Sequence, residues 1–202
     1  LYEAMRVGAL ANVVAGTIHG DSPYGVFDRV VNDLNVPPTS FKATDIIVVT
    51  NPIKTPDGLH TKKRVVQITE IRKHWVSDPI REKGFVDLMR YNVETDCLEP
   101  TQELINGDSE IIKSIASNVK GWAGNWDAVF DNIILRGKIK EEIVNKSLEL
   151  NKPAIMEAEF NALANNAFHK ISEDIRSEFG LPLSDRVLPK FIEWLNKEAE
   201  NF

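Results

Sequence analysis

The first clear hydrophobic pattern in the chain is a short, almost continuous apolar run over residues 12–18. Such a run is typical of a strand buried on both faces, as in the centre of a parallel sheet. Ser22 can cap a helix, Pro23 suits its first position, and apolar residues then recur with helical spacing over residues 26–34. The pattern therefore predicts a strand, a turn and a helix, with His19 at the carboxyl end of the strand.

Three later segments of the first half also carry strand patterns. Residues 45–50 form an apolar run, residues 64–72 alternate between apolar and polar side chains, and residues 85–93 are apolar with a less regular spacing. A turn signal at residues 56–58, Pro-Asp-Gly, separates the first two. We therefore expect residues 1–99 to form an α/β domain.

After about residue 100 the apolar period becomes helical. Four amphipathic stripes follow one another, with Gly137 as a candidate break in the second and Gly180 with Pro182 ending the third. Residues 100–202 are therefore predicted to be an all-helical region. The stripes either pack on one another, which the pattern favours, or present apolar surface to a docking partner.

Composition narrows the range of functions. The chain of 202 residues carries a formal net charge of −6, which argues against a nucleic-acid partner. Its single cysteine, Cys97, excludes an intrachain disulfide, and we interpret this residue as a small apolar filler. No apolar run approaches the roughly 18 residues that span a bilayer, so no transmembrane segment is expected.

His19 is the most informative candidate for chemistry. Ligands of open α/β sheets bind outside the carboxyl ends of the strands, where His19 is predicted to lie. A neutral imidazole there can donate a hydrogen bond to a phosphate oxygen or to an attacking water, although a purely structural role stays open. The scattered histidines form no metal-ligand pair, so no metal site is expected, and neither phosphate-binding glycine motif occurs.

The residues around His19 also resemble a known motif. Gly16-Thr17-Ile18-His19, followed by Asp28-Arg29-Val30, is similar to the histidine box of the type II/type IV secretion-system ATPase superfamily. Members of this superfamily power secretion, pilus assembly and the archaeal flagellum. Residues 41–49 and 63–71 resemble the strands that follow the box, and residues 108–116 resemble the helical C-terminal region of archaeal members.

This resemblance implies the C-terminal part of a RecA-like P-loop NTPase core, over residues 1–99, followed by the helical region. It implies ATP and Mg²⁺ as cofactors, with catalytic His19 sensing or orienting the γ-phosphate and Thr17 helping to place the strand end. Arg29 would support the nucleotide site or a subunit contact, or be structural. The phosphate-binding loop would precede Leu1, so that this segment alone would be inactive and part of a longer protein.

The resemblance also implies partners and a location. The complete protein would be a homo-hexamer that contacts a membrane platform protein, cytoplasmic and peripheral at the inner face of the membrane. The alternative function is a non-catalytic helical docking module that binds no nucleotide by itself.

Overall fold

The structure, a computed structural model, describes residues 2–7, 13–55 and 57–202. It separates into two compact units, residues 1–112 and residues 113–202, which we call the sheet unit and the helical unit. The sequence predicted a division after residue 99. Among the described residues, no helix is both long enough and apolar enough to cross a membrane.

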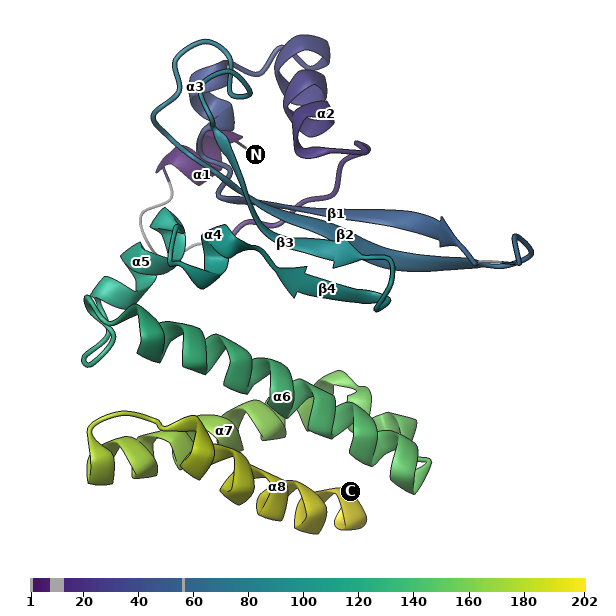
Figure 1. The fold of residues 1–202 in the computed structure, drawn as a ribbon, viewed down its shortest axis with the longest axis vertical. Helices are drawn as coiled ribbons and strands as arrows, with labels where there is room; N and C mark the ends of the chain where they lie inside the picture. Colours follow the sequence, from purple (N-terminus) through teal and green to yellow (C-terminus); the bar gives the residue numbers. More distant parts are fainter. Residues whose placement is uncertain (1, 8–12, 56) are drawn as a thin grey trace. The chain divides into compact units, whose positions relative to one another are not determined.

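The sheet unit combines short helices with four strands (Figure 1). The helices before the sheet are α1 (Tyr2–Val7), α2 (Pro23–Asp28), a π-helix (Arg29–Asp33) and α3 (Pro38–Phe41). The strands are β1 (Ile46–Lys54), β2 (Thr61–Ile71), β3 (Phe85–Asn92) and β4 (Cys97–Pro100). Helix α4 (Gln102–Ile105) follows the sheet, and α5 (Glu110–Ser117) begins in this unit and ends in the helical unit.

The four strands form an antiparallel sheet in the order β1-β2-β3-β4, so the fold is mixed α/β. The predicted strands at residues 45–50, 64–72 and 85–93 are confirmed as β1, β2 and β3. Strand β4 was not predicted because its four residues carry too short a pattern. It forms because the chain reverses at Asp96, which has a left-handed φ of 51°, and pairs with β3.

The predicted strand over residues 12–18 is wrong for residues 13–18, and residue 12 lies outside the described residues. Residues 13–20 form neither helix nor strand, and the side chain of Val13 is 99% exposed. An apolar run becomes a strand only when a neighbouring strand satisfies its backbone hydrogen bonds. The observed sheet is antiparallel and gives this segment no such neighbour, so a parallel RecA-like sheet is not confirmed.

The core of the sheet unit lies on one face of the sheet, beneath α2 and α3 (Figure 1). In β1, Ile47 and Val49 are buried on this face, while the alternating residues Ile46 and Val48 are exposed. The ring of Phe27 packs edge-on against those of Phe41, at 5.2 Å between centroids, and Trp75, at 5.6 Å. Edge-to-face aromatic packing stabilises a fold beyond the area that it buries, and these contacts hold α2 against α3 and the loop after β2.

The helical unit is built from α6 (Trp126–Leu150), a short 3-10 helix (Pro153–Met156), α7 (Ala158–Phe179) and α8 (Ser184–Asn201). The helices predicted after residue 100 are therefore confirmed, and Gly137 does not interrupt α6. Asn151 directly follows α6 and Gly180 directly follows α7, and both have the left-handed conformation typical of the residue after a helix. The apolar faces of α6, α7 and α8 pack on one another around Leu135, Phe160, Phe168, Val187, Phe191 and Leu195.

Candidate functional site

Thr17 and His19 lie on the surface of the sheet unit, in the segment of residues 13–20 that has no regular secondary structure. Both residues are exposed, and neither side chain makes a hydrogen bond or ion pair with any other residue that the structure describes. The sequence predicted His19 at the end of a buried strand. The structure instead places it at the end of an exposed segment that leads into α2.

The chain immediately after His19 is held against α2. A Cβ on Gly20 would lie only 2.8 Å from the side chain of Val26, so the backbone approaches the helix closely there. The Ser22 hydroxyl accepts a hydrogen bond from the amide of Gly25 at 3.1 Å and caps α2, with Pro23 at the first helical position as predicted. His19 therefore lies four positions before Pro23, the first residue of a well-anchored helix.

Arg29 begins the π-helix that continues α2, and its side chain is exposed. Single π-turns inside helices are frequent at functional sites, although they occur elsewhere too. The next residue, Val30, is fully buried and ties this turn to the core. Within the described part of the chain, no hydrogen bond or ion pair joins Arg29 to Thr17 or His19, so the structure does not link the predicted site residues directly.

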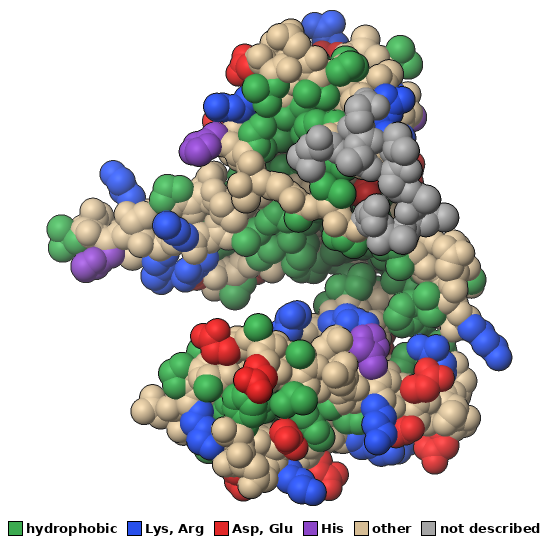
Figure 2. Space-filling view, turned by 180° about the vertical axis from the view of Figure 1, so that it is seen from behind, with side chains coloured by type: hydrophobic (Ala, Val, Ile, Leu, Met, Phe, Trp, Pro, Cys, Tyr) green, Lys and Arg blue, Asp and Glu red, His purple; other side chains and the backbone are tan. Residues whose placement is uncertain are grey.

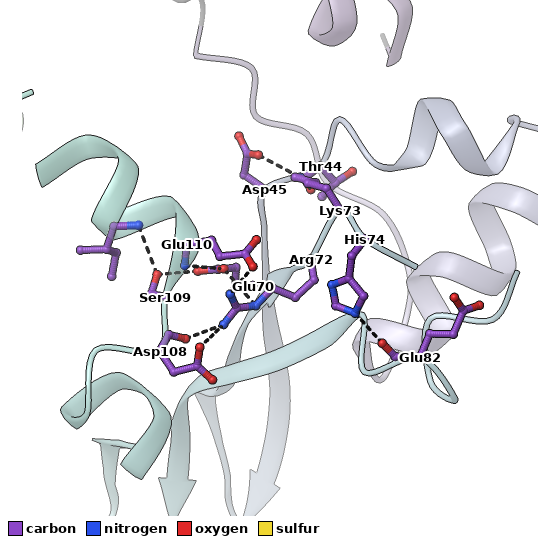
Figure 3. A network of polar contacts seen from close by, with 11 residues as sticks. Thr44, Asp45, Glu70, Arg72, Lys73, His74, Glu82, Asp108, Ser109 and Glu110 are labelled. Carbon is purple, nitrogen blue, oxygen red and sulfur yellow. Dashed lines mark hydrogen bonds and ion pairs between the residues drawn. The ribbon is translucent and has the colours of Figure 1, made fainter. Parts of the chain in front are cut away.

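The densest polar network lies elsewhere, around the fully buried carboxylate of Glu70 at the end of β2 (Figure 3). This carboxylate accepts hydrogen bonds from the hydroxyl of Ser109 and, at 2.9 Å, from the amide of Glu110. Ser109 also accepts a hydrogen bond from the amide of Ile112 and so caps α5. The network thus ties the start of α5 to the sheet.

Arg72, only 5% exposed, completes this network. Its guanidinium lies 3.3 Å from the Glu70 carboxylate and 2.9 Å from the carboxylates of Asp108 and Glu110. Burial by itself lowers the pKa of Arg72, but the charge of Glu70 and the hydrogen bond and charges of the other two carboxylates outweigh it and raise that pKa. The guanidinium faces the buried carboxylate of Glu70 and also pairs with the largely exposed carboxylates of Asp108 and Glu110 beside the start of α5, so we interpret the network as a structural clamp.

The clamp was not predicted from the sequence, because the position of Glu70 in β2 does not reveal its burial. Glu70 lies two residues after Ile68 in β2, and residues two apart in a strand point to the same face. The register places Ile68 opposite Val48 and Glu70 opposite Ile46, so a carboxylate falls in an apolar row. Ile46 and Val48 are themselves exposed, so a carboxylate in this row is expected to lie in solvent. Glu70 is buried only because Arg72 and the start of α5 pack onto it.

The loop after β2 is held by a second set of contacts (Figure 3). Lys73 pairs with Asp45 at 3.0 Å, and the imidazole of His74 lies 2.7 Å from the carbonyl oxygen of Glu82. The Glu82 carboxylate accepts hydrogen bonds from the amides of Val76, Ser77 and Asp78. These amide donors lower the pKa of Glu82 to about 2, because they stabilise the charged carboxylate.

Other features give no site for a small ligand or metal around His19. Two shallow depressions, of about 260 Å³ and 240 Å³, are lined wholly by residues of the helical unit, among them Asp131. Across the ranges that the structure describes, no group of three or more histidine, cysteine or acidic residues is placed to hold a metal ion. Cys97 is exposed on β4, so its interpretation as an apolar filler is wrong. An edge strand leaves alternate side chains in solvent whatever their polarity.

No known family model matches the chain, and no curated protein matches it either.

Proposed function

We propose that this chain is part of an ATP-hydrolysing motor subunit that powers protein secretion or the assembly of a pilus-type or flagellum-type filament. In this proposal His19 contacts the γ-phosphate of ATP, and Thr17 supports it at the same surface. The phosphate-binding loop belongs to polypeptide outside these 202 residues, which contain no such glycine-rich motif. The proposal rests on the histidine box at residues 16–30.

The observation that carries the proposal is the exposure of Thr17 and His19 without any partner among the described residues. A histidine with a structural role is expected to be hydrogen-bonded to its own fold, whereas a ligand-contacting histidine must present free ring nitrogens. The close approach of Gly20 to Val26 limits where the histidine can lie. An imidazole without a partner in the fold can donate to a phosphate oxygen without first breaking a contact.

The phosphate is not expected to sit at the first turn of α2. The Ser22 hydroxyl already caps this turn and donates to the Asp21 carboxylate at 3.0 Å. The negative charge of Asp21 would repel a phosphate at that position. The γ-phosphate would therefore approach the preceding segment, from the side of Thr17 and His19.

ATP and Mg²⁺ fit this chain only in part. The imidazole and hydroxyl of the histidine box suit the γ-phosphate end of the nucleotide, but the described residues offer no set of ligands for Mg²⁺. When bound, Mg²⁺ would neutralise charge on the β- and γ-phosphates. We propose that neighbouring parts of a homo-hexamer supply these ligands, with Arg29 at the nucleotide site or at a subunit contact. A membrane platform protein would recruit the motor to the inner face of the membrane.

The test is the ATPase rate of the complete motor carrying His19→Ala. Loss of one preorganised donor is expected to lower kcat by about 10²-fold or more, because the donor acts on charge that develops in the transition state. The matched control is His169→Ala, which removes an exposed histidine from α7 and should leave kcat unchanged. Near-normal turnover of a folded His19→Ala hexamer would contradict the proposal.

Titration of the 202-residue chain with ATP provides a second test. Since the main phosphate contacts lie outside the chain, we expect no calorimetric signal at micromolar ATP. Tight binding would mean that these residues hold the phosphates by themselves, and the assignment of roles above would be wrong.

A docking module is the second candidate function, and one surface of α6 favours it. Ile134, Val144 and Leu148 are exposed by 39%, 43% and 70%, and they lie on one face of the helix. A row of exposed apolar side chains on a long helix is suited to a protein partner. Under this function, Val144→Ser with Leu148→Ser should abolish binding of the platform protein, measured by calorimetry, while His19→Ala leaves it intact.

A further inference from the structure

The β1–β2 hairpin continues beyond the sheet as a two-stranded arm, which we define as residues 52–55 and 57–64 (Figure 1). Strands β1 and β2 pair as far as Lys54 with Thr61. Strand β3 pairs with β2 only from Gln67 onward, so the arm has no third strand beside it. The arm therefore projects from the sheet unit as two strands only, and residues 57–63 are all exposed.

The end of the arm is held in a defined shape by side-chain hydrogen bonds. The Asp57 carboxylate accepts from the hydroxyl of Thr55 and, at 2.9 Å, from the amide of Leu59. The Thr55 hydroxyl accepts from the amide of His60 at 3.1 Å. These bonds hold Leu59 at the apex, where its side chain is 81% exposed. The arm thus carries a large apolar side chain at its end, and the folded chain does not cover it.

The arm is also positively charged on an acidic chain. It carries four cations, Lys54, Lys62, Lys63 and Arg64, against the single carboxylate of Asp57, whereas the whole chain has a net charge of −6. Figure 2 shows Lys and Arg side chains gathered along this projecting hairpin, with hydrophobic atoms at its end.

Two of these cations are already paired and two are not. Lys62 and Arg64 bind the carboxylate of Asp96, at 3.1 Å and 2.8 Å. Lys54 and Lys63 are exposed, and within the described ranges neither side chain has a hydrogen bond or ion pair. They can therefore meet external anions without breaking a contact of the fold.

We propose that the arm docks on a membrane surface that contains anionic lipids. Leu59 enters the boundary between headgroups and acyl chains, while Lys54 and Lys63 contact lipid phosphates. A stable protein interface buries roughly 1,000 Å² or more in total and needs a partner of complementary shape. A bilayer, in contrast, accepts a single apolar side chain, and each basic residue near its surface adds about 1 kcal/mol.

This docking is an additional activity and does not depend on ATP or on His19. Because one leucine and two free lysines give only a modest affinity, binding is reversible and falls as salt screens the charges. The arm would thus bring the sheet unit to an anionic membrane surface.

The test is sedimentation of the full chain with vesicles of neutral lipid alone and with 30% anionic lipid added. We expect partition into the anionic vesicles only, weakened at high salt. Lys54→Gln with Lys63→Gln should lower the partition coefficient about 25-fold, since about 1 kcal/mol per lysine is about five-fold. Leu59→Ser should lower it roughly ten-fold, as burial of a leucine is lost.

Matched controls lie on α6. Lys138→Gln with Lys140→Gln makes the same change of net charge, and Leu148→Ser removes another exposed leucine, one that is 70% exposed. Both controls should bind as the unmodified chain does. Equal binding of the arm variants and the controls would overturn the proposal, and so would equal binding to neutral vesicles.

A third outcome would assign the arm to a protein instead. Self-association that the arm variants abolish, with no vesicle binding at low salt, would show that an acidic surface of a second copy is the partner. That result would also overturn the membrane proposal, and none of these outcomes bears on the ATPase test of His19.

Discussion

Removing the cation from the clamp should open the start of α5. Arg72→Met takes away the charge that faces the fully buried carboxylate of Glu70, while a side chain of similar length still fills the space. It also removes the ion pairs to Asp108 and Glu110 and the bond to the Asp108 carbonyl oxygen at 2.6 Å. Removing one partner of a buried ion pair lowers folding stability by about 3–5 kcal/mol, because the remaining charge stays buried without a counter-ion.

Hydrogen exchange measured by mass spectrometry resolves this loss locally. A cost of about 3 kcal/mol corresponds to about 150-fold faster exchange in the EX2 regime, since each 1.4 kcal/mol is a factor of ten. We expect this change in peptides from β2 and from the first turn of α5. Peptides from α7 and α8 belong to the helical unit and serve as the internal reference.

Two further variants make the clamp hypothesis refutable. Arg90→Met removes a cation that is 69% exposed and pairs with Asp87, and a pair of this kind contributes about 1 kcal/mol or less. Glu70→Leu combined with Arg72→Met removes both buried charges and should restore at least half of the lost protection. If Arg72→Met costs no more than Arg90→Met, the buried pair does not hold α5 and the reasoning is wrong.

Three smaller predictions follow from single positions. Gly84→Ala places a Cβ 2.5 Å from the buried ring of Trp75 and should destabilise the sheet unit by about 1–3 kcal/mol in urea unfolding. Gly137→Ala places a Cβ in open space within α6 and should instead stabilise the helical unit by up to about 1 kcal/mol in the same assay. A decrease in its free energy of unfolding would contradict the structure. The amide hydrogen bonds lower the pKa of Glu82 in the folded chain. The contribution of its carboxylate to folding stability is therefore fully present above pH 4.5 and is lost as the pH falls toward 2. The amide NMR shifts of residues 76–78 should follow that titration, and Glu82→Gln should abolish it.

The sequence by itself determined the elements whose signals are local. The alternation in β2 and the apolar runs of β1 and β3 predicted strands because side chains in a strand alternate between two faces. The cap at Ser22 and the helical stripes after residue 100 predicted helices in the same way, since each pattern repeats within a few residues.

The tertiary structure alone decided which of these elements have neighbours. Residues 13–18 have the composition of a buried strand, but a strand needs a paired strand, and the sheet that forms is antiparallel and lies elsewhere in the chain. The burial of Glu70 and the exposure of His19 likewise depend on contacts between residues far apart in sequence. A local pattern records what a residue prefers, whereas its burial depends on which distant residues pack against it.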